Sequence, residues 1–96
     1  SDLPQVIATP EIRLDCPDET KFQIVEKTKS ILMRGKYKIT DIDGVRVDFG
    51  DAWGLVRASN TQPVLVLRYE APTQARLDEI RKIVESALGE AGHKIS

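Results

Sequence analysis

One short segment combines the residue types that suit anion binding: Arg57-Ala58-Ser59-Asn60-Thr61-Gln62-Pro63. Arginine offers a planar, permanently charged group that fits the oxygens of a phosphate. The hydroxyls of Ser59 and Thr61 and the amide of Asn60 add neutral donors, and a tight turn presents backbone N–H groups beside them. The same residues also form ordinary turns, so the segment predicts either a phosphate site or a plain hairpin turn.

The charges around this segment favour the anion site. The chain carries 15 Asp and Glu residues, yet none lies between Ala52 and Tyr69, where the only charged residues are Arg57 and Arg68. Arg68 lies in the most apolar stretch of the chain, where a charge is costly without a partner. In a simple hairpin Arg68 falls roughly across from Gly54 and reaches along the sheet toward the segment. The alternative is an ion pair with Glu70 or with an acid on a helix.

Other kinds of site lack the residues that they need. Cys16 is the only cysteine and His93 the only histidine, which excludes an internal disulfide, a zinc site and a Ser–His–Asp triad. The run Asp41-Ile42-Asp43-Gly44 resembles the start of a calcium loop, but strand-like alternation follows it, so we interpret it as a hairpin turn. Asp48 and Asp51 have no apolar surroundings and are interpreted as turn acids. We therefore expect no metal in this chain.

Length and composition indicate one globular domain. The chain has 96 residues, 41% of them hydrophobic, a formal net charge of −1 and a pI of about 5.8. This charge argues against a nucleic-acid surface, and Trp53 and Tyr69 have no basic face around them. No apolar run approaches 18 residues, so we expect no membrane partner. Because the chain begins at Ser1, we expect a piece of a longer protein, with residues 1–6 a leader or expression remnant and 93–96 a tail.

The N-terminal third predicts a strand and a helix. Residues 7–15 alternate, with Ile12 and Leu14 on one face, and Pro10 marks the start or edge of a strand. A helix start is predicted at residues 16–19 and a stop at Gly35. The expected buried face combines two overlapping sets of helix positions: Phe22, Val25, Lys29 and Leu32, widened by Ile24, Thr28 and Ile31.

The remainder predicts four strands and a second helix. Alternating segments at 37–42, 45–49, 53–57 and 64–70 are joined by short turns, the first of them the two-residue turn Asp43-Gly44. Thr73 is the expected N-cap of a helix that ends at Gly89 or Gly92. Its apolar stripe is wide: Leu77, Ile80, Ile83, Val84, Ala87, Leu88 and Ala91. The order β-α-β-β-β-β-α predicts an α+β fold, a mainly antiparallel sheet with both helices on one face.

Three segments together resemble the C-terminal domain of the α-D-phosphohexomutases, closest to bacterial phosphomannomutase/phosphoglucomutase. They are Asp43–Val47, Trp53–Thr61 and Pro63–Ala71, and the opening Ala8–Ile12 is also similar. The resemblance covers nearly the whole chain and implies a TATA-binding-protein-like domain over residues 7–92. It implies that the loop binds the phosphate of a hexose phosphate that is not reacting. Four residues match the family's phosphate loop: Arg57, Ser59, Asn60 and Thr61. Arg68 matches a downstream arginine that supports phosphate binding in some members. The common family form has Glu where this chain has Gln62.

The family's phosphoserine loop and aspartate-rich magnesium loop have no match in this chain. The resemblance therefore implies that the fragment is inactive alone and binds no cofactor. It implies a cytoplasmic parent enzyme of the isomerase class, an intramolecular phosphotransferase. That parent would use Mg²⁺ and a hexose 1,6-bisphosphate activator, and its partners would be mannose or glucose 1- and 6-phosphates and its own other domains. The alternative is a free-standing α/β regulatory or interaction module without phosphate affinity.

Overall fold

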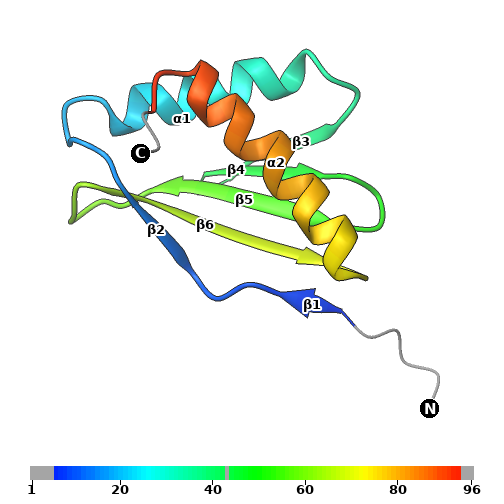
Figure 1. The fold of residues 1–96 in the computed structure, drawn as a ribbon. Coiled ribbons are helices and arrows are strands. Elements are labelled where there is room, and N and C mark those ends of the chain that lie inside the picture. Colours follow the sequence, from blue (N-terminus) through cyan, green and yellow to red (C-terminus); the bar gives the residue numbers. More distant parts are fainter. Residues whose placement is uncertain (1–5, 43, 94–96) are drawn as a thin grey trace.

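The chain folds as two helices on one face of a single antiparallel sheet, which confirms the predicted α+β class (Figure 1). The computed structural model describes residues 6–42 and 44–93. The strands are β1 (Ile7–Ala8), β2 (Ile12–Asp15), β3 (Lys38–Asp41), β4 (Val45–Asp48), β5 (Trp53–Ala58) and β6 (Val64–Ala71), and the helices are α1 (Lys21–Met33) and α2 (Gln74–Glu90). The sheet order is β1-β6-β5-β4-β3, and β2 also pairs with β6. Strand β6 therefore pairs with both N-terminal strands and is followed directly by the C-terminal helix α2.

The N-terminal segment forms two short strands rather than one. β1 pairs Ile7 with Ala71, and β2 pairs Ile12 with Leu67, both antiparallel to β6. Pro10 lies between them and has no N–H to donate to the ladder, which explains the interruption. The predicted leader, 1–6, and tail, 93–96, lie mostly outside the described residues. His93 itself is buried, and its Nε2 lies 2.9 Å from the carbonyl oxygen of Asp15.

The core lies between the sheet and the helices. Alternate residues of the central strands point toward the helices and are buried, among them Leu65, Leu67, Val56 and Val47. The largest side chain of this layer is Tyr69, whose hydroxyl donates to Glu85 Oε2 at 3.2 Å. Burial raises the pKa of Tyr69, and the charge of Glu85 raises it further, so the phenol stays protonated. Among the residues that the structure describes, no helix lies on the other face of the sheet (Figure 1).

Helix α1 begins later than its sequence predicts. Its buried face also differs in part from the predicted one. The predicted start at 16–19 is instead a turn, in which the carbonyl oxygen of Pro17 accepts from the N–H groups of Thr20 and Lys21 at 3.1 and 2.9 Å. Phe22 is 54% exposed, whereas Lys21 is 3% exposed. The buried face is the set Lys21, Ile24, Val25, Thr28 and Leu32. Val25 and Leu32 of the first predicted set and Ile24 and Thr28 of the widening set are thus buried as expected, whereas Phe22 was placed wrongly.

The other turns are partly as expected. Thr73 caps α2, since its Oγ1 accepts from the N–H of Arg76 at 3.1 Å. After α2, Gly92 adopts a left-handed φ of 110°, and the N–H of His93 donates to the carbonyl oxygen of Leu88. In the β3–β4 hairpin Asp41 pairs with Val45, whereas a two-residue turn would pair residue 42 with Val45. Asp43 lies outside the described residues.

The β5–β6 register differs from the prediction by one residue. Arg68 pairs with Leu55, and Gly54 pairs with Tyr69. Because side chains alternate between faces, this difference separates Arg68 from Gly54. Gly54 instead makes room on the helix side, where a Cβ would lie 3.1 Å from Cδ1 of Tyr69. Arg68 lies on the open face with Leu55.

Candidate anion site

The β5–β6 loop is closed by its own hydrogen bonds. The N–H of Ser59 donates to the carbonyl oxygen of Val64 at 3.0 Å, and the N–H of Val64 donates to that of Gln62 at 2.8 Å. Ser59 Oγ accepts from the N–H groups of Thr61 and Gln62 at 3.3 and 3.2 Å. Two of the backbone donors expected for an anion thus point at Ser59. Because a hydroxyl can accept and donate together, the Ser59 proton remains available for a ligand.

The four predicted loop residues line one open cleft of about 400 Å³. These are Arg57, Ser59, Asn60 and Thr61, joined by Arg13, Gln62, Val64 and Val66. The Arg57 side chain is 41% exposed, so solvent and ligands reach its guanidinium. The cleft combines the guanidinium groups of Arg57 and Arg13 with hydroxyl and amide groups, which is the donor set that phosphate oxygens prefer.

Arg68 lies beside this cleft rather than in it. It lines a neighbouring cleft of about 730 Å³, whose walls include Arg57 and Asn60 as well. The register explains this position: Arg57 pairs with Val66, and Arg68 follows two residues later on the same face. Within residues 6–42 and 44–93, no Asp or Glu lies within ion-pair distance of Arg68. The sequence-based alternative of an ion pair with Glu70 is therefore not what the structure has.

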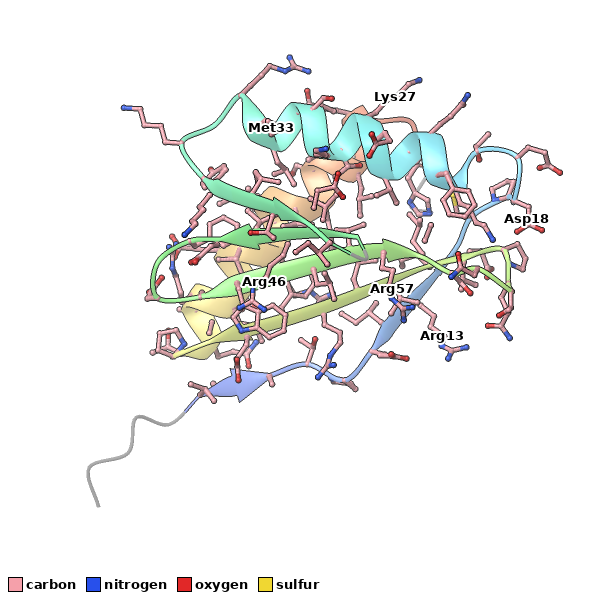
Figure 2. The ribbon with its side chains drawn as sticks, turned by 180° about the vertical axis from the view of Figure 1, so that it is seen from behind. Arg13, Asp18, Lys27, Met33, Arg46 and Arg57 are labelled. Carbon is pink, nitrogen blue, oxygen red and sulfur yellow. The ribbon has the colours of Figure 1, made fainter. Side chains whose placement is uncertain are left out.

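Strand β2 and the residue before it bring two further charged side chains to the loop, and no local pattern pointed to them. Glu11 Oε2 lies 3.9 Å from Arg57 Nη2, and Glu11 Oε1 lies 3.7 Å from Arg13 Nη2. Arg13 Nη1 also donates to Gln62 Oε1 at 2.9 Å. In Figure 2, Arg13 and Arg57 lie next to each other on the open face. The window that is free of acids in the sequence therefore has a carboxylate at its edge in the fold.

A buried ammonium supports the loop from behind. Lys21 Nζ donates to the carbonyl oxygen of Gln62 at 3.0 Å and to Asp18 Oδ1 at 2.8 Å, and the Lys21 side chain is 4% exposed. The N–H of Cys16 donates to the carbonyl oxygen of Pro63 at 2.8 Å. The segment between β2 and α1 thus fixes the C-terminal half of the loop. No sequence pattern pointed to Lys21, because its partner is 41 residues away.

We expect Lys21→Met to loosen the loop at a modest cost to the global fold. Methionine fills the same buried space, and the Asp18 side chain is exposed, so the main loss is the donor to the Gln62 carbonyl, which lowers the free energy of unfolding by about 1–3 kcal/mol. The Gln62 carbonyl loses its donor, so amide hydrogen exchange at Ser59 should become about tenfold faster. Lys29→Met is the matched control, because Lys29 pairs with Asp41 on β3. Equal exchange at Ser59 in both variants would contradict this role for Lys21.

The two acids that the sequence analysis interpreted as turn acids, Asp48 and Asp51, each have a partner outside the loop. Asp51 pairs with Arg76 at 3.1 Å, and Asp48 Oδ1 accepts from the N–H of Gly50 at 2.8 Å. In the part of the chain that the structure describes, no three His, Cys, Asp or Glu side chains gather as metal ligands would. None of its helices is long and apolar enough to cross a membrane.

Comparisons with known proteins identify the family. Residues 11–87 match the family described as phosphoglucomutase/phosphomannomutase, C-terminal domain. A phosphomannomutase/phosphoglucomutase from Pseudomonas syringae is 53% identical over 85 residues, which are 88% of this chain and 18% of that protein. A phosphoglucomutase from Neisseria gonorrhoeae is 41% identical over 96 residues, covering 98% of this chain and 21% of that protein.

A solved structure has the same fold. It is a phosphoglucomutase/phosphomannomutase family protein from Burkholderia thailandensis, with a TM-score of 0.77 and 34% identity over 98% of this chain and 19% of that one. The chain thus spans about a fifth of the length of the proteins it matches. With the sequence match and the fold in agreement, the chain belongs to the phosphoglucomutase/phosphomannomutase family and corresponds to its C-terminal domain.

Proposed function

We propose that this domain binds the non-reacting phosphate of a hexose phosphate while other domains of a longer enzyme transfer the reacting phosphoryl group. One arrangement carries this proposal: Arg57, Ser59, Asn60 and Thr61 line the same open cleft. Arg68 on the adjoining wall adds positive charge at its edge. Family membership favours this role over that of a free-standing interaction module.

The longer enzyme would interconvert hexose 1-phosphates and 6-phosphates of mannose or glucose, as an intramolecular phosphotransferase of the isomerase class. A hexose 1,6-bisphosphate would be its activator and intermediate, and the loop would hold whichever phosphate is not reacting. Binding energy from this remote phosphate would position the reacting end and exclude water. The domain would close over the substrate as a lid.

The chemical step would lie outside this chain, which would be inactive alone. Mg²⁺ chemistry in particular needs carboxylate ligands, and the described residues bring no such group together. The metal and the phosphoserine would therefore be held by other domains. We place the enzyme in the cytoplasm, where Cys16, the only cysteine of this chain and buried, would stay reduced.

A titration of the ¹⁵N-labelled chain with inorganic phosphate at low salt tests the site, because screening weakens exposed charge pairs. We expect the largest amide shifts at residues 57–61 and at Arg68, with millimolar affinity, and the same pattern with glucose 1-phosphate. Glucose at equal concentration is the control, since it lacks the phosphate. Shifts spread evenly over the surface, or equal shifts with glucose, would contradict the proposal.

A further inference from the structure

Arg13 and Arg57 flank one residue on the open face of the sheet. Val66 pairs with Arg13 of β2 on one side and with Arg57 of β5 on the other. The two arginine backbones are thus two strand spacings apart, about 10 Å. Val66 is only 4% exposed although neither α1 nor α2 covers it, which we attribute to the aliphatic stems of its neighbours. Both guanidinium groups consequently lie over the same short stretch of the sheet (Figure 2).

Glu11 marks a point that both arginines reach. Its carboxylate lies 3.7 Å from Arg13 and 3.9 Å from Arg57, with one oxygen toward each. The three side chains are between 41% and 58% exposed, and both distances are long for ion pairs. Exposed pairs of this kind are weak, so an anion of higher charge can replace the carboxylate. Phosphate also presents several oxygens to two guanidinium groups at once.

Arg13 is oriented toward the cleft by a second contact. Its Nη1 donates to Gln62 Oε1 at 2.9 Å, which joins β2 to the loop. Arginine has five N–H donors, so this bond leaves others for a ligand. Arg13 also lines the cleft together with the loop residues Ser59, Asn60 and Thr61.

We propose that Arg13 is a second anchoring arginine of the anion site, and that the Glu11 carboxylate lies between Arg13 and Arg57 until a phosphate group displaces it. This proposal rests on the proposed function of the loop and adds two residues to it. Arg13 strengthens binding by direct contact, and Glu11 weakens it by competition. Substituting these two residues should therefore change phosphate affinity in opposite directions.

Phosphate affinities of single variants of the chain test this, measured by NMR titration at one ionic strength. We expect Arg13→Gln to weaken binding of inorganic phosphate about tenfold, the usual effect of losing a charged hydrogen bond. Glu11→Gln should tighten it about two- to fivefold. Arg46→Gln is the control for lost positive charge, because Arg46 lies over the Trp53 ring at 4.5 Å, farther along the face. Glu79→Gln is the control for a lost carboxylate that pairs with an arginine.

Thermal unfolding without phosphate separates binding from a structural role. If Arg13→Gln lowers the melting temperature but keeps the phosphate affinity of the unmodified chain, Arg13 only ties β2 to the loop and the inference is wrong. Weaker binding in Glu11→Gln would show that the carboxylate orients Arg57, which also overturns it. Arg57→Ala distinguishes the two proposals. If it abolishes binding while Arg13→Gln leaves the phosphate affinity unchanged, only this inference fails, and if it has no effect, the loop assignment itself fails. No binding by either the unmodified chain or Glu11→Gln overturns both.

Discussion

Leu67→Ala should lower the free energy of unfolding by about 2–5 kcal/mol, the cost of a cavity at a fully buried leucine. Leu67 is 0% exposed at the centre of β6, with Ile12 of β2 on one side and Val56 of β5 on the other. Its side chain lies in the layer between sheet and helices, where neighbours on two layers limit collapse around the missing atoms. For a domain of this size the melting temperature should fall by roughly 10 °C or more. Urea unfolding of both proteins measures the difference.

Leu55→Ala is the matched control for Leu67→Ala. Leu55 has the same side chain on the neighbouring strand, but it is half-buried on the open face. Removing it should cost about 1 kcal/mol, because less apolar area returns to water. Equal losses in the two variants would mean that the open face is packed as tightly as the helix side. That result would contradict the core described above.

Local patterns predicted most of the fold. Period-two alternation and short turns gave the four consecutive strands, since each contacts a neighbour only a few residues away. Thr73 was found because an N-cap depends only on the residues that follow it. Helix α1 was harder, because its apolar residues fit two overlapping stripes. Packing against the sheet buries members of both stripes, and it buries Lys21 in place of Phe22.

The candidate site, too, was predictable only where its residues are neighbours in the sequence. The loop residues Arg57 to Thr61 adjoin one another in the sequence, so their chemistry was readable there. Glu11 and Arg13 reach the loop only because β2 pairs with β6, about fifty residues along the chain, and a pairing of that range has no local signal. The one-residue difference in the β5–β6 register has a similar cause. The number of loop residues that close the hairpin depends on the bonds of Ser59 and Val64, which no turn pattern specifies.

Arg57→Ala in the longer enzyme that we propose for this domain should lower kcat/KM for hexose phosphates about 10- to 100-fold. The change removes a charged fork with direct access to the cleft, and hydrogen bonds to charged groups typically contribute that much. Since the loop would hold either phosphate in turn, the 1-phosphate and the 6-phosphate should lose activity to a similar extent. Part of the loss should fall on kcat, because the anchored phosphate positions the distant reacting group. Steady-state rates over a range of substrate concentrations separate the two parameters.

Arg46→Ala shows whether the Arg57→Ala loss comes from the site or from the charge. Both arginines extend from the open face, but Arg46 stacks on Trp53 rather than lining the cleft (Figure 2). Loss of either removes one positive charge, so a general effect of net charge on substrate attraction would lower kcat/KM equally in both. We expect Arg46→Ala to stay within twofold of the unmodified enzyme. An Arg57→Ala enzyme within the same range would show that the loop, despite its donors, contributes no binding energy to the reaction, and the domain would then need a role other than holding phosphate.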